Sequence, residues 1–166
     1  GIWGGQLQRW RNGVFNPNNP TSPTAFLPND DESALLPFVA KMSDDLLEFA
    51  EKPREVQILD ETGKLLLAGD NERRFFEAAW VHKYNGKYYF SYSTGDTHFI
   101  CYAIGDNPYG PFTYKGKILN PVVGWTSHHS ICEFKGKWYL FYHDSSLSKG
   151  VTHLRSIKIA EIQYDE

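Results

Sequence analysis

One carboxylate in this sequence has neighbours that suit acid catalysis. Glu77 lies among aromatic and small apolar residues, with Phe75 and Phe76 before it and Trp80 after it. An apolar environment disfavours the charged form of a carboxyl group, raises its pKa and keeps it protonated near neutral pH. A general acid needs a protonated carboxyl, so we predict that Glu77 has a raised pKa and donates a proton. The alternative is an ordinary solvated glutamate.

A hairpin that follows Glu77 occurs a second time in the chain. The copies, residues 84–92 and 134–142, start 50 residues apart, and each centres on a turn between aromatic strands. A period of about 40 to 50 residues of this kind is typical of β-propeller blades. The first strand of each blade lines the central channel, so residues just upstream of the two hairpins should converge. We therefore predict that Glu77 and His128 face each other at the axis.

The remaining pattern predicts strands separated by turns, with no sustained helical period. Residues 12–34 are rich in proline and predict a long loop, and residues 43–48 predict a loop rather than a capped helical turn. Strands are predicted at 35–43, 56–59, 64–68, 80–84, 87–92, 99–104, 130–134, 138–143 and 154–162. At about 50 residues per blade the chain holds about three blades, whereas closed propellers have about four to eight. The ring is therefore expected to be incomplete.

Composition limits the classes of partner. With 17 basic and 20 acidic residues in no long run, the sequence predicts neither a nucleic-acid partner nor an acidic tail. No apolar run approaches the roughly 18 residues that cross a bilayer, so no membrane association is predicted. Cys101 and Cys132 are expected to be buried free thiols, with one disulfide between strands as the alternative.

Four segments in order carry a resemblance to a known family. They are residues 75–80, the hairpin 84–92, residues 125–131 and residues 153–157. Together they resemble glycoside hydrolase family 43, whose members are five-bladed propeller enzymes, mostly β-xylosidases and α-L-arabinofuranosidases. The resemblance covers nearly the whole chain but matches only the C-terminal portion of such an enzyme. It implies an all-β fold in which residues 1–166 form about three C-terminal blades of a partial catalytic domain, with the N-terminal blades absent.

The resemblance also implies roles for individual residues. Glu77 corresponds to the family's general acid, although many members continue with Gly-Pro where this chain has Ala78 and Ala79. His128 resembles an axial histidine beside a water-coordinated metal ion, often calcium, under the sugar site. Arg155 resembles an arginine of the last blade that reaches the sugar or the acid. No organic cofactor is implied.

Each of these roles has a simpler alternative. His128 could equally be a structural histidine, and the spacing of the histidines around it does not match a zinc site. Arg155 falls within the alternating pattern 154–159, where an outward-facing arginine is an even alternative. Trp3, Trp10 and Trp125 could stack on sugars, but tryptophans in sheet proteins are more often core residues. Trp3 and Phe76 are kept as candidate substrate contacts.

Inverting glycosidases need a second carboxylate that activates water on the opposite face of the sugar. Family members carry that base, and an aspartate that tunes the acid, in blades upstream of this chain. The aspartates at positions 30, 31, 44 and 45 do not match those motifs. The leading prediction is thus an inverting glycosidase for xylose- or arabinose-containing plant polysaccharides or oligosaccharides, completed by an N-terminal polypeptide. A non-catalytic carbohydrate-binding propeller fragment and a purely structural set of blades are the alternatives.

Overall fold

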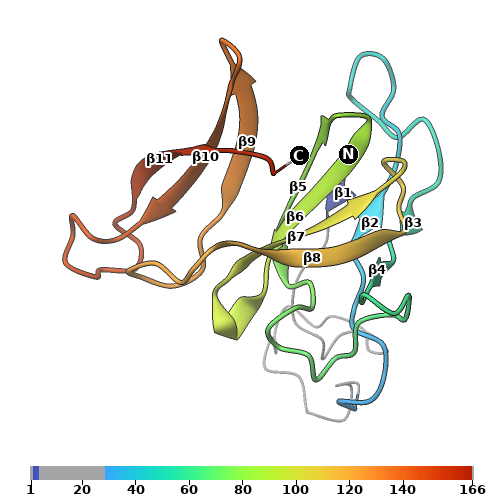
Figure 1. Cartoon of the computed structure of the whole chain (residues 1–166), viewed down its shortest axis with the longest axis horizontal. Helices are drawn as coiled ribbons and strands as arrows, with labels where there is room; N and C mark the ends of the chain where they lie inside the picture. Colours follow the sequence, from blue (N-terminus) through green and yellow to red (C-terminus); the bar gives the residue numbers. More distant parts are fainter. Residues whose placement is uncertain (1, 4–28, 166) are drawn as a thin grey trace.

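The computed structural model describes residues 2–3 and 29–165 of the 166-residue chain. The described part is all-β, with no α-helix and one 3₁₀ turn at Gly95–Thr97. Figure 1 shows the strands in sequence colours. They are β1 (Ile2–Trp3), β2 (Phe38–Val39), β3 (Arg54–Glu55), β4 (Ile58–Leu59), β5 (Glu77–Tyr84), β6 (Lys87–Ser93), β7 (Ile100–Gly105), β8 (Phe112–Leu119), β9 (His129–Phe134), β10 (Lys137–Asp144) and β11 (Ser156–Ile162).

These strands form three sheets that follow one another in space. Their orders are β1-β2-β3, then β4-β8-β7-β6-β5, then β9-β10-β11. The edge strands β1, β5 and β9 come together, because β1 lies beside β5 and β5 lies beside β9 (Figure 1). Each sheet therefore places one edge strand beside that of the next sheet, as the innermost strands of adjacent propeller blades lie.

Turn chemistry explains the two repeated hairpins. Asn85 and Gly86 both have positive φ, 44° and 78°, between the paired residues Tyr84 and Lys87. This is the backbone of the two-residue turns that match strand twist, and Asn-Gly is the sequence that favours it most. Lys135 and Gly136 repeat the pattern with φ of 53° and 77°. The two hairpins predicted from the repeat are confirmed.

The main core lies between the first two sheets. The ring of Phe90 packs with its centroid 6.1 Å from that of Phe75, 5.2 Å from Tyr92 and 5.3 Å from Phe112. All four side chains are almost fully buried. Val39 on β2 belongs to the same cluster, so burial of these aromatics fastens the five-stranded sheet to the first sheet.

Several sequence expectations are confirmed in this part of the chain. Residues 43–48 are a loop, in which Asp45 accepts hydrogen bonds from the Ser43 hydroxyl and the Leu47 amide. The turn predicted between 56–59 and 64–68 starts at Asp60 and brings Leu59 opposite Leu65, but only Ile58–Leu59 is a strand and the strand predicted at 64–68 is absent. The loop predicted at 12–34 falls mostly outside the described residues.

Other expectations are wrong in detail. Of the strand predicted at 35–43, only Phe38–Val39 pairs as a strand. The last strand begins at Ser156, so Arg155 lies before it rather than inside it. Both cysteines are free thiols, but only Cys101 is buried and Cys132 is exposed. Cys132 borders a cavity on the exposed face of the last sheet, together with Phe134 and Ile159.

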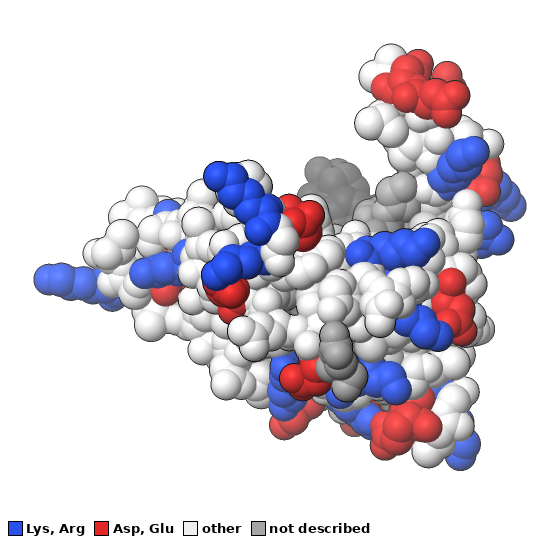
Figure 2. All heavy atoms as spheres, turned by 45° about the horizontal axis from the view of Figure 1, so that its top comes forward, with Lys and Arg blue, Asp and Glu red and all other residues white. Residues whose placement is uncertain are grey.

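Charged side chains are mixed over the surface. Figure 2 shows Lys and Arg interspersed with Asp and Glu on the face drawn, among wide uncharged areas. Within residues 2–3 and 29–165, no helix is long and apolar enough to cross a membrane.

Candidate active site

A β-bulge begins the strand that carries Glu77. Glu77 pairs with Ser93 and Trp80 pairs with Ser91, so Ala78 and Ala79 together stand opposite a single residue. Ala78 has φ of 59°, a left-handed conformation that costs a residue with a Cβ about 1 kcal/mol. Bulges bend a strand and redirect its side chains. Because of the bulge, the direction of the Glu77 side chain does not follow the regular alternation of side chains along the rest of β5.

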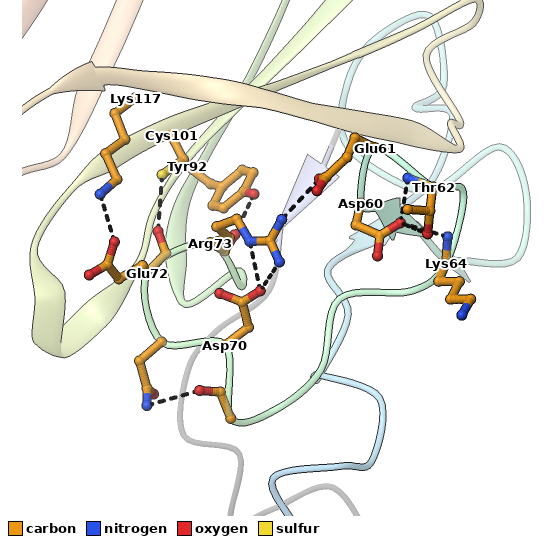
Figure 3. A network of polar contacts seen from close by, with 12 residues as sticks. Asp60, Glu61, Thr62, Lys64, Asp70, Glu72, Arg73, Tyr92, Cys101 and Lys117 are labelled. Carbon is orange, nitrogen blue, oxygen red and sulfur yellow. Dashed lines mark hydrogen bonds and ion pairs between the residues drawn. The ribbon is translucent and has the colours of Figure 1, made fainter.

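The segment that leads into Glu77 is anchored to the five-stranded sheet (Figure 3). The buried hydroxyl of Tyr92 donates a 2.6 Å hydrogen bond to the carbonyl of Arg73, and Lys117 lies 2.9 Å from the carboxylate of Glu72. Exposed ion pairs contribute little, about 0 to 1 kcal/mol each, so the buried tyrosine contributes most to this anchoring. The backbone just before Glu77 is therefore held in a fixed position against β6.

The structure brings Glu77 and His128 together from two sheets. His128 Nε2 lies 3.3 Å from Glu77 Oε1, with 54% and 25% of the two side chains exposed. The Thr126 side chain also acts on the Glu77 carboxylate and lowers its pKa. His128 and Thr126 both belong to the loop before β9, which lies beside β5. The predicted convergence of the two blade starts is thus seen in the geometry.

The predicted raised pKa of Glu77 is wrong for the described residues. The pKa of this carboxyl is lowered, mainly because His128 hydrogen-bonds its charged form. Desolvation acts in the opposite direction, while Thr126 and the charge of Arg155 add to the lowering. The aromatic neighbours in sequence do not enclose the carboxylate, since Phe75 points into the core.

Arg155 reaches the same place from the segment before β11. Its Nε donates a 2.8 Å hydrogen bond to the Thr152 carbonyl, and its Nη1 lies 3.4 Å from His143 Nε2. Its positive charge favours the ionised form of Glu77. The arginine predicted to act near the acid is therefore close enough to affect its charge.

Trp80 and His129 fasten the two sheets together behind this site. The Trp80 indole donates a 3.1 Å hydrogen bond to the Ile131 carbonyl, and His129 Nε2 lies 2.6 Å from the Ser91 hydroxyl. Burial lowers the pKa of His129 to about 3, so its ring is neutral. Trp80 therefore joins two blades instead of forming an apolar wall around the acid.

The four aromatic residues considered as sugar contacts have different outcomes. Phe76 is partly buried with its ring against Gly95, where a Cβ would come within 2.8 Å of that ring. Trp3 pairs with Phe38 in β1, beside β5, but its side chain lies outside the described part. Trp10 lies outside it altogether, and Trp125 is 61% exposed in the loop before His128. The substrate contacts of Trp3 and Phe76 stay predictions.

The described residues do not fit a calcium site on their own. Calcium takes about six to eight oxygen ligands. Among residues 2–3 and 29–165, no three His, Cys, Asp or Glu side chains gather as metal ligands would. His128 offers a ring nitrogen, which already faces the Glu77 carboxylate. The predicted metal role of His128 stays a prediction.

Two residues of the site were not singled out from sequence. Thr126 stands two positions before His128 in the same motif, so its closeness in sequence to His128 could have indicated that it lies near Glu77. His143 stands at the far end of the second hairpin, and its ring stacks with that of His128 at a centroid distance of 6.2 Å. Only the pairing of β9 with β10 brings these two histidines together.

Comparison with known proteins shows what the chain is similar to. The sequence profile for glycosyl hydrolases family 43 matches residues 32–166. A xylosidase/arabinosidase from Bacteroides ovatus is 66% identical over 99% of this chain and 49% of its own length. A β-xylosidase from Xylanibacter ruminicola is 61% identical over 99% of this chain and 50% of its own length. The chain spans about half the length of these curated relatives.

A solved structure agrees with the sequence matches. It is a family 43 β-xylosidase/α-arabinofuranosidase from a compost microbial metagenome, in complex with xylotriose and in a calcium-free form. It superposes with a TM-score of 0.89 at 61% identity, over 99% of this chain and 50% of that one. The predicted fold, all-β and made of the C-terminal blades of a five-bladed propeller, is confirmed by this match and by the sheets. The chain belongs to glycosyl hydrolases family 43.

Proposed function

We propose that this chain is the acid-bearing part of an inverting glycosidase that acts on xylose- or arabinose-containing oligosaccharides or polysaccharides. The observation that carries the proposal is the Glu77 carboxylate, held 3.3 Å from His128 and within the field of Arg155 where two blades meet. Relatives that match nearly all of this chain are named xylosidases and arabinosidases, and one was solved with xylotriose.

The chemistry requires two carboxyl groups. Glu77 donates its proton to the glycosidic oxygen as the bond from that oxygen to the anomeric carbon breaks. A water molecule attacks the anomeric carbon from the opposite face and gives its proton to a carboxylate base. We assign that base to blades outside this chain. Asp30 is not a substitute, because it lines a cavity of about 310 Å³ whose walls do not include Glu77.

The proposal also requires a way for Glu77 to keep a proton. Among the described residues, the groups that shift its pKa include His128, Thr126 and Arg155, and none is an acid. A second carboxylate nearby disfavours ionisation of the first and raises its pKa. We propose that the aspartates of the missing blades reverse the lowering that His128 causes.

Arg155, Phe76 and Trp3 are the proposed sugar contacts. Arg155 is exposed, its charge acts on the acid, and its guanidinium has donors for sugar hydroxyls. Phe76 precedes the acid directly, and Trp3 lies on the edge strand beside β5.

The uncovered face of the last sheet supports an N-terminal polypeptide as partner. Phe134, Ile157 and Ile159 are 60%, 77% and 60% exposed on it. Phe134 and Ile159 border a cavity of about 320 Å³ with Tyr139 and Phe141. An apolar surface of this kind marks an interface. We propose that the three described sheets are one blade each of a partial domain over residues 1–166, and that the missing blades cover this face.

Calcium at the axis, beside His128, belongs to the same proposal. Its oxygen ligands would come from water and from the missing blades, since the described residues supply no ligand cluster. Metal analysis of the complete protein, before and after dialysis against a chelator, tests this. We expect calcium in the first sample, and its absence there would show that the prediction is wrong.

The decisive test of the function is Glu77→Gln in the complete protein, this chain together with its N-terminal blades. We expect hydrolysis of a substrate with a sugar leaving group to fall by about 10²- to 10⁴-fold, as loss of a general acid does. A substrate with a very good leaving group should lose less, because it needs less protonation. The exposed Glu55 provides the control, Glu55→Gln. Unchanged hydrolysis in Glu77→Gln would show that Glu77 is not the acid.

A non-catalytic carbohydrate-binding role is the second candidate. It is favoured by the lowered pKa of Glu77, which leaves the described part with an ionised carboxylate at neutral pH. Calorimetry with xylotriose separates the two functions. Binding without turnover by the complete protein would establish the binding role, and turnover would exclude it.

A further inference from the structure

Two hydrogen-bond donors converge on one nitrogen of His143. The backbone amide of His128 donates to His143 Nε2 over 3.0 Å, and Nη1 of Arg155 lies 3.4 Å from the same atom. Neither a backbone amide nor a guanidinium gives up its proton at ordinary pH. His143 Nε2 must therefore be the acceptor, which places the proton of the neutral ring on Nδ1.

The two donors belong to residues whose side chains also act on Glu77. The ring of His128 lies 3.3 Å from the carboxylate, while its backbone amide bonds His143, and Arg155 acts on the carboxylate through its charge. His143 does not itself touch Glu77 in any described contact. Its ring nitrogen is thus positioned to hold both partners of the acid at once.

The backbone of His143 holds the same loop. The Ser127 hydroxyl donates to the His143 carbonyl over 2.8 Å, and the His143 amide lies 3.2 Å from that hydroxyl oxygen. Ser127 is almost fully buried. The loop from Thr126 to His128 is therefore fastened to β10 through both the backbone and the ring of one residue.

We propose that His143 is a positioning residue for the acid: its neutral ring, as the Nδ1–H tautomer, fixes the His128 loop and Arg155 against Glu77. The inference rests on the proposed function. Loss of the acceptor should release both neighbours and misplace the proton donor, without removing any group that touches the substrate.

The test compares His143→Leu with His143→Gln in the complete protein. Leucine removes the acceptor, whereas the side-chain oxygen of glutamine can take the place of Nε2. We expect kcat/KM for a substrate with a sugar leaving group to fall about tenfold or more in the leucine variant and to recover in the glutamine variant. For a substrate with a very good leaving group the loss should be much smaller, because that reaction needs little help from the acid.

The controls are the same two substitutions at His153, which is exposed in the same part of the chain. Neither should change kcat/KM. A general loss of structure in His143→Leu would lower kcat/KM equally for both substrates and would also lower Tm. Equal losses on the two substrates, equal effects of leucine and glutamine, or no effect of either would overturn the proposal.

Nitrogen-15 NMR of histidine-labelled complete protein gives a readout besides activity. The signal lost in His143→Gln identifies the ring, and we expect its Nδ1 to be protonated and its Nε2 to be unprotonated. A protonated Nε2 at a pH where the enzyme turns over would overturn the inference while leaving the proposed function intact. Failure of the wild-type protein to hydrolyse any substrate would instead refute the proposed function, and the positioning role with it.

Discussion

The two ends of strand β5 use histidine in opposite ways. At the first end, Glu77 meets His128, which is 54% exposed and faces a carboxylate. At the other end, His82 is partly buried among aromatic rings, 5.3 Å from Tyr89 and 5.2 Å from Trp138 between centroids. Burial lowers the pKa of His82 to about 4, so this ring is neutral.

The difference shows that environment, rather than residue type, assigns the role. At the far end Tyr164 stacks on Tyr84 at 3.8 Å and its hydroxyl lies 2.5 Å from His82 Nε2, which fastens the end of the chain across two sheets. Neighbours in sequence differ just as sharply, since His128 faces Glu77 while His129 turns to Ser91. One end of the strand is arranged for chemistry and the other for cohesion.

Removal of His129 should have the largest effect on folding. His129→Ala leaves a void between the blades and takes the partner from the Ser91 hydroxyl, so we expect a loss of about 2 to 3 kcal/mol in unfolding free energy. Urea unfolding of the complete protein measures it. His153→Ala, on an exposed side chain, should change stability by less than about 0.5 kcal/mol. A loss as small in His129→Ala would mean that this histidine does not join the blades.

The far end should make stability depend on pH. The pKa of His82 is about 4 when folded and near 6.5 when unfolded, so the unfolded chain binds a proton first as pH falls. The folded state keeps its full stability above pH 6.5 as far as His82 is concerned, and loses part of it as pH falls from about 6.5 to 4. The loss in unfolding free energy is about 2 kcal/mol after allowance for partial exposure of the ring.

His82→Phe removes that titrating group and keeps an aromatic ring. We expect the variant to lose less stability than the wild type between pH 7 and pH 4.5, measured from denaturation midpoints. The matched control is His153→Phe, which should keep the wild-type slope. Equal slopes in all three proteins would show that His82 does not titrate with a lowered pKa.

The chemical end should respond through activity. His128→Ala removes the ring that hydrogen-bonds Glu77, and we expect kcat/KM to fall about tenfold, close to 1.4 kcal/mol, with a small change in Tm. The ring is more than half exposed, so little packing is lost with it. A large drop in Tm with unchanged kcat/KM would mean that His128, like His129, serves stability and not catalysis.

The smallest expected effect concerns the bulge at Ala78. Ala78→Gly relieves the left-handed φ of 59° but adds freedom to the unfolded chain, so we expect a net gain of about 0.5 kcal/mol. Thermal unfolding measures it, with Ala79→Gly as the control that should destabilise instead. A loss in Ala78→Gly would mean that the bulge places no strain on Ala78.

The sequence by itself determined the local structure of this protein. The Asn85-Gly86 turn, the repeated hairpin and the alternation of β11 depend on neighbouring residues, so they predicted the strands and an incomplete ring of blades. The order of short motifs also predicted that Glu77 and His128 converge, because blade starts meet wherever a propeller forms.

Only the tertiary structure decided how the site works. The pKa of Glu77 moved against the prediction because a histidine 51 positions away outweighs the burial suggested by adjacent aromatics. The partners of Arg155 and His143, the exposure of Cys132 and the roles of Trp80 and His129 likewise depend on contacts between sheets. Charge and desolvation act through distance in space, and residue order does not specify those distances until the strands have packed.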